Sequence, residues 1–173
     1  PGVAPSRCLV LTDSYLVVLD RLSSNTEHRY SWIYHDRGRT VECAAANGAA
    51  ATSLDLSGEE FLDLSGSGAT DAEVAARFAG PQVTTALRVA AASASRIHRG
   101  TGVGASVLDR VPLLIVERRG KIGEFAAILA PHTADHPTSV RGIRGDTDTV
   151  SIRIGDRVDE ISWSRENVIR FRR

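Results

Sequence analysis

Apolar and polar residues alternate with a period of two along most of the chain. Short apolar runs with β-branched or aromatic members occupy residues 8–12, 15–19, 28–35, 40–43, 83–89, 111–116, 125–129, 150–154 and 161–163. Turn-forming residues separate the later runs, at Gly120, Pro131, Gly145 and Gly155. Many short strands at this spacing are typical of stacked antiparallel sheets. The pattern therefore predicts an all-β antiparallel β-sandwich with at most one short helix.

The connections between these strands are predicted from their turn residues. Asp13 and Ser14 predict a tight turn between the first two strands. Residues 22–27 would then join the strand ending at Asp20 to an aromatic strand as a hairpin, and residues 36–38 would turn that strand back. The small residues of segment 44–52 predict a loop.

Residues 71–78 give a mixed signal. Their composition favours a helix with an acidic first turn, but the segment is short and flanked by glycines. A short helix and a strand are both left open.

Composition limits the classes of protein to which the chain can belong. It has 173 residues, 42% of them hydrophobic and 24% charged, which suits one domain with its own core. The 21 basic and 21 acidic residues give zero net charge, whereas a nucleic-acid-binding surface shows a basic excess. The sequence contains no run of eighteen apolar residues, the length that would predict a membrane span. We expect a single domain over residues 1–173, with neither nucleic acid nor membrane as partner.

The two cysteines, Cys8 and Cys43, are not arranged as a CxxC pair. One disulfide and two free thiols both remain open.

Residues 20–35 hold the densest group of chemically active side chains. Asp20 ends an apolar run, where it either caps a turn or serves as a metal ligand. His28 and His35 are seven positions apart, which puts them on opposite faces of a regular strand. Tyr30, together with the aromatic residues two and four positions later, forms one face that suits either a packed core or a platform for a sugar.

Other segments carry weaker signals. Residues 100–104 are glycine-rich but lack the lysine of a phosphate loop, which favours a hairpin. Residues 65–68 do not form a nucleophile elbow. His132 and His136 flank a proline-containing loop, where they are either exposed or bind a metal, and His98 is predicted to lie on the surface.

Two pairs of segments carry a family resemblance. Residues 15–24 and the aromatic segment 28–35 resemble the start of the C-terminal β-sandwich domain of heparinase II/III-like polysaccharide lyases. Residues 110–116 and 125–131 resemble the paired strands that close this sandwich. The resemblance implies a supersandwich-like fold and a C-terminal fragment of a longer lyase. The chain opens at Pro1 and contains no methionine, which we also expect of a piece of a longer protein.

The resemblance also implies a function. Such lyases join an α/α toroid to the sandwich and cleave acidic, uronic-acid-containing polysaccharides by β-elimination, outside the cell or in the periplasm. Acid/base roles would then fall to His28 and Tyr30, and zinc would be bound by Asp20 and His35. A further histidine ligand would lie before Pro1. We expect the chain to be inactive without its toroid, and the alternative is a non-catalytic carbohydrate-binding or scaffold module.

Overall fold

The computed structural model describes residues 2–51, 54, 58–164, 166 and 168–173, and it confirms an all-β antiparallel sandwich. The strands are β1 (Ala4–Leu11), β2 (Leu16–His35), β3 (Thr40–Cys43), β4 (Asp63–Thr70), β5 (Val74–Ala79), β6 (Thr84–Val89), β7 (Ser95–Val103), β8 (Arg110–His132), β9 (Val140–Gly145), β10 (Thr149–Ile154), β11 (Arg157–Trp163) and β12 (Ile169–Arg172). The helical elements in the described residues are two 3-10 turns, η1 (Ala44–Ala46) and η2 (Glu59–Phe61).

Two long strands, β2 and β8, form the spine of an eight-stranded sheet. Residues 16–23 of β2 pair with residues 122–129 of β8, and residues 28–35 pair with residues 113–120. The other neighbours of β8 change along its length: β7 pairs with residues 110–117, whereas β6 pairs with residues 127–132. The sheet therefore divides into two arms that share the same spine.

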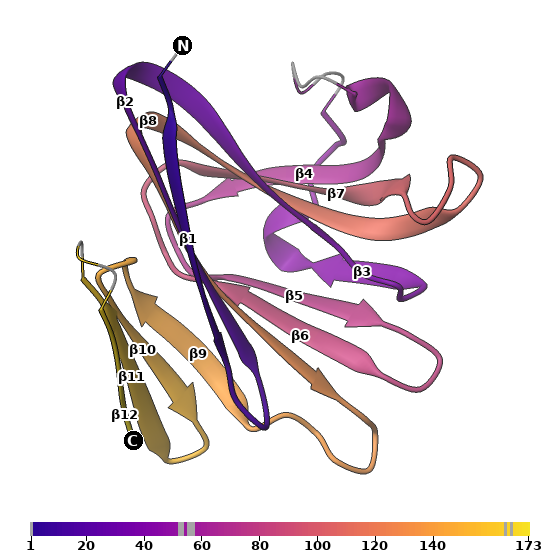
Figure 1. Cartoon of the computed structure of the whole chain (residues 1–173). Helices are drawn as coiled ribbons and strands as arrows, with labels where there is room; N and C mark the ends of the chain where they lie inside the picture. Colours follow the sequence, from indigo (N-terminus) through magenta and orange to yellow (C-terminus); the bar gives the residue numbers. More distant parts are fainter. Residues whose placement is uncertain (1, 52–53, 55–57, 165, 167) are drawn as a thin grey trace.

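The upper arm consists of β4, β7 and the spine residues 28–35 and 113–120. The lower arm consists of β1, the remaining paired halves of the spine, β6, β5 and β3. Figure 1 shows the arms diverging, with β4 and β7 above β5 and β6. Side chains of both arms meet in core 1, which includes Val18, Tyr30, Trp32, Phe78, Leu87, Ile97, Leu114 and Phe125.

A four-stranded sheet, β9 to β12, packs on the other face of the lower arm. It lies at the lower left of Figure 1, beside β1. Core 2 lies between the two sheets and includes Tyr15, Val17, Leu19, Ile128, Ile143, Val150, Ile152, Ile161 and Trp163. The lower arm is thus covered on both faces, which explains why residues 125–130 of β8 are all buried and read as a continuous apolar run.

Several predicted connections are wrong because they lie inside the strands β2 and β8. Residues 22–27 lie inside β2 as a local irregularity between Ser23 and His28, and Gly120 lies inside β8. Long strands are possible here because each half of β2 has a paired partner in β8. The turn at Asp13 and Ser14 is confirmed, since β1 and β2 form an antiparallel hairpin across it.

The structure also gives the conformation of residues 74–78 and 44–46, in two segments for which the sequence predicted a helix or strand and a loop. Of residues 71–78, positions 74–78 belong to strand β5. The predicted loop begins as the 3-10 turn η1, and its last residue, Thr52, lies outside the described residues.

Cys8 and Cys43 are free and buried in different cores, so they form no disulfide with each other. Among the described residues, no helix is long and apolar enough to cross a membrane.

Candidate functional site

Asp20 lies within β2, buried opposite Arg7 of β1. Arg7 donates from Nε to Oδ1 at 2.5 Å and from Nη2 to Oδ2 at 2.8 Å. The indole Nε1 of Trp32 also donates to Oδ2, at 3.0 Å. The carboxylate is therefore bound by a guanidinium fork and an indole N–H. The turn-capping interpretation of Asp20 is wrong, because the residue lies inside a paired strand.

His35 lies at the far end of the same strand. Asp20 pairs with Phe125 and His35 pairs with Leu113. The Nδ1 of His35 lies 3.2 Å from the Val103 carbonyl of β7, whereas the Asp20 carboxylate is bound by Arg7 and Trp32. Among the described residues the two side chains have no hydrogen-bond partner in common, and zinc binding by Asp20 and His35 stays a prediction. The described residues also contain no group of three histidine, cysteine or acidic side chains placed to hold a metal.

Tyr30 and His28, the predicted acid/base residues, lie near the irregular middle of β2. Tyr30 is buried in core 1 and donates its hydroxyl to the Lys121 carbonyl at 3.1 Å. The imidazole Nε2 of His28 makes hydrogen bonds with the hydroxyls of Ser24 at 3.0 Å and Thr26 at 3.1 Å. The ring of Tyr30 thus has the core position that the sequence left open, and the catalytic role of the pair stays a prediction.

A mostly apolar groove opens where β1 faces the free edge of the aromatic half of β2. We call it the mouth groove. Its larger part, about 590 Å³, lies between Arg7 and the β1–β2 turn, and a smaller part, about 370 Å³, continues beyond Arg7 along Asp20 and Phe125. Leu9 and Leu11 form its exposed apolar wall. Arg7 stands where the two parts of the groove meet.

A second concavity, of about 630 Å³, has more basic than acidic side chains in its lining. We call it the basic basin. Its charged and titratable lining consists of Arg77, Arg88, Arg99, His132, Glu42 and Cys43. The remaining lining is mostly small side chains, including Ala44, Ala75, Ala76 and Ala86.

The cations of the basin differ in how firmly they are held. Arg99 donates to the Ala46 carbonyl at 2.9 Å, so its position is fixed by the backbone. Arg88 is bound to Glu73 in a close ion pair. Arg77 and its partner Glu42 are both exposed and 3.8 Å apart, a pairing that contributes little. Arg77 is consequently the cation that an anionic ligand engages most easily.

Sequence reasoning missed a buried polar network on the upper arm. His98 is buried, contrary to the predicted surface position, and its Nδ1 makes a 2.8 Å hydrogen bond with the Ser67 hydroxyl. Its Nε2 lies 3.2 Å from the carboxylate of Glu117, which is also buried. The Ser67 hydroxyl accepts the Ala51 N–H at 2.9 Å. The three side chains connect β4, β7 and β8 and line neither the mouth groove nor the basic basin. Strand β7 was not predicted from the sequence, because residues 100–104 are rich in glycine and favoured a hairpin.

The sequence matches no protein-family model, and no curated protein matches it.

Proposed function

We propose that the chain is the sandwich part of a lyase acting on acidic polysaccharides, and that its own role is to bind the polysaccharide in the basic basin. The observation that carries the proposal is the lining of that basin: three guanidinium groups and one imidazole against the carboxylate of Glu42, with the carboxylate of Glu73 paired to Arg88. A chain of neutral net charge that concentrates cations in one concavity suits an anionic ligand.

The chemistry of the basin fits uronate residues. A guanidinium presents two parallel N–H donors that match a carboxylate. Arg99 and Arg88 are held by protein partners, so little side-chain entropy is lost when a ligand binds near them. The alanine side chains in the lining are small, which leaves space in the basin for a sugar ring. β-Elimination requires neutralisation of the uronate carboxylate, and cations of this kind supply it.

A matched pair of variants tests the proposal. Arg77→Gln removes an exposed guanidinium inside the basin, and Arg119→Gln removes an exposed guanidinium outside it, which pairs with Glu27 at 3.6 Å much as Arg77 pairs with Glu42. Affinity for alginate, heparan sulfate and hyaluronan would be measured by calorimetry at two salt concentrations. For the polysaccharide that binds, we expect affinity to fall about tenfold in Arg77→Gln, which corresponds to 1.4 kcal/mol, to change little in Arg119→Gln, and to weaken with salt.

Equal affinities for the two variants would contradict the basin as the binding site. Absence of binding to all three polysaccharides would contradict the proposed function.

A non-catalytic carbohydrate-binding module is the second candidate. It is favoured by one observation: the hydroxyl of Tyr30 is bound to a backbone carbonyl and the ring lies in a core. Intact mass and N-terminal sequencing of the native protein separate the two candidates. A longer precursor with a helical region upstream supports the lyase, and a mature protein of this length supports the module. Ultraviolet absorbance of unsaturated uronate products should stay flat for this chain alone and rise when a toroid is supplied.

A further inference from the structure

The carboxylate of Asp20 is buried between two strands, and the resemblance points to it as a metal ligand. We propose that the guanidinium of Arg7 takes the place of a metal ion at Asp20, so that this site is a metal-independent clamp. The clamp joins β1 to the aromatic half of β2 and holds a fixed cation at the junction of the two parts of the mouth groove. The inference does not depend on the proposed function, because it concerns the other concavity.

The geometry of the carboxylate supports this assignment. Each oxygen of Asp20 accepts a hydrogen bond from a different nitrogen of Arg7, at 2.5 and 2.8 Å. This bidentate arrangement is the strongest that a guanidinium and a carboxylate form. A zinc ion would have to lie about 2.0–2.2 Å from a carboxylate oxygen. It would then compete directly with Arg7 for the lone pairs that the fork occupies.

The third donor completes the site. Trp32 lies twelve positions after Asp20 in the same strand, but its indole Nε1 reaches Oδ2 at 3.0 Å across the groove. The indole N–H is a donor and cannot be a metal ligand. Three N–H donors around one carboxylate stabilise the anion without a metal. The carboxylate is thereby satisfied although it is buried.

The surroundings offer no second ligand from the adjoining strands. The residues paired with Asp20 are Arg7 on one side and Phe125 on the other. The hydrogen bond to Asp20 also raises the pKa of Arg7, which keeps the guanidinium charged. The Arg7 side chain is 61% exposed, whereas Asp20 is buried, so the clamp presents a rigid cation to the groove.

The test combines metal analysis with thermal unfolding of the full chain. Zinc would be measured by elemental analysis after incubation with excess zinc and dialysis, for the unmodified protein and for Asp20→Asn. Melting temperatures would be measured with and without a chelator for the unmodified protein, Arg7→Gln, and Arg119→Gln as the exposed control. We expect no stoichiometric zinc, no effect of the chelator, and a melting temperature lower by on the order of 5 °C in Arg7→Gln. Arg119→Gln should melt like the unmodified protein.

Two outcomes would overturn the inference: one zinc ion per chain that is lost in Asp20→Asn, or a melting temperature of Arg7→Gln equal to that of the control. If Arg7→Gln does not fold, Arg7→Lys keeps the charge but not the fork, and a melting temperature below that of the unmodified protein is expected. An unchanged value in Arg7→Lys would contradict the bidentate clamp. Addition of zinc should not restore either variant, and restoration would show that the site takes a metal after all.

Discussion

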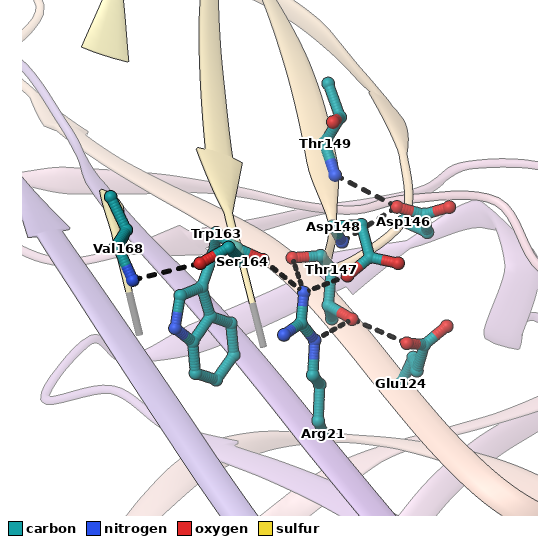
Figure 2. A network of polar contacts seen from close by, with 9 residues as sticks. All are labelled: Arg21, Glu124, Asp146, Thr147, Asp148, Thr149, Trp163, Ser164 and Val168. Carbon is teal, nitrogen blue, oxygen red and sulfur yellow. Dashed lines mark hydrogen bonds and ion pairs between the residues drawn. The ribbon is translucent and has the colours of Figure 1, made fainter. Parts of the chain in front are cut away.

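Arg21 of β2 anchors the four-stranded sheet to the lower arm. Its guanidinium donates to the Thr147 hydroxyl at 2.8 Å, to the Thr147 carbonyl at 2.7 Å and to the Trp163 carbonyl at 2.6 Å, and it pairs with Asp148. It also lies 4.2 Å from the centre of the Trp163 ring. Figure 2 shows Arg21 reaching from β2 to both Thr147 and Trp163, with Glu124 of β8 accepting from the Thr147 hydroxyl. Replacement of Arg21 by glutamine should therefore weaken the attachment of the second sheet.

The size of the effect follows from these contacts. Hydrogen bonds from a charged donor contribute about 1.5–3 kcal/mol each, and a cation–π contact about 1 kcal/mol. The Arg21 side chain is only 17% exposed, but Asp148 is 62% exposed and its ion pair adds little. Water and the glutamine amide will replace some of the hydrogen bonds that the guanidinium made. We expect a net loss of about 3 kcal/mol in the free energy of unfolding, which lowers the melting temperature by about 6–12 °C in a chain of this length.

Urea unfolding followed by circular dichroism and tryptophan emission measures this loss. The emission is informative because Trp163 is itself part of the network and Trp32 lies in core 1. Arg119→Gln is the control, since Arg119 makes an exposed ion pair. A loss in Arg21→Gln below about 1 kcal/mol, or no larger than that of the control, would refute the assignment of Arg21 as the anchor.

Four further predictions follow from other contacts. Tyr15→Phe removes the 2.6 Å hydrogen bond to the buried carboxylate of Asp159 and should cost about 2 kcal/mol in urea unfolding; an unchanged midpoint would contradict it. Gly123→Ala should cost about 1–3 kcal/mol, because the added Cβ would lie 2.4 Å from the Tyr30 ring, whereas Gly120→Ala, with 3.3 Å to its nearest neighbour, should cost less. Burial raises the pKa of the thiols of Cys8 and Cys43, so a thiol reagent should label neither in the folded protein and both in urea; rapid labelling of the folded protein would show that a core opens. Burial raises the pKa of Tyr15 and Tyr34, so above pH 10 the unfolded chain loses phenolic protons that the folded chain keeps, and stability should fall. Burial lowers the pKa of Arg118 to about 10, which acts in the opposite direction but on one group against two; a melting temperature that rises between pH 10 and 11 would contradict this balance.

The fold class could be predicted from the sequence because alternation and turn residues are local signals. Strand β3, residues 40–43, and the β1–β2 turn were found in this way. The continuity of β2 and β8 could not be found, because it depends on pairing between segments about a hundred positions apart. Polar residues 23–27 and Gly120 look like turns to any local rule. Residues 24–27 have no partner in β8, but Ser23 and His28 on either side of them pair with Ile122 and Gly120, so one strand continues through the irregularity.

The candidate sites, like the fold, could be predicted from the sequence only in part. The sequence singled out Asp20 as a carboxylate at the margin of a core, and the structure confirms that it is buried with partners. Its partner Arg7 was missed because cross-strand position follows from the register of the β1–β2 hairpin, not from spacing. His98 was placed on the surface because it lies between two arginines, but β7 is an interior strand of the sheet. The basic basin combines residues of β5, β6, β7 and β8, and no window of sequence contains it.

The shared spine has a consequence for the growing chain. Leu16 pairs with Leu129, so β2 emerges from the ribosome long before the strand it needs. At about 5–20 residues per second, the 97 residues between the ends of β2 and β8 take about 5–20 s to synthesise. During that interval the edge of β2 that later pairs with β8 has no partner, while β1 covers residues 16–23 of the opposite edge. Non-local pairing of this kind also slows folding after release. A nascent chain stalled before residue 110 would therefore expose an unpaired strand edge. Chaperones should bind nascent chains of that length more than completed ones.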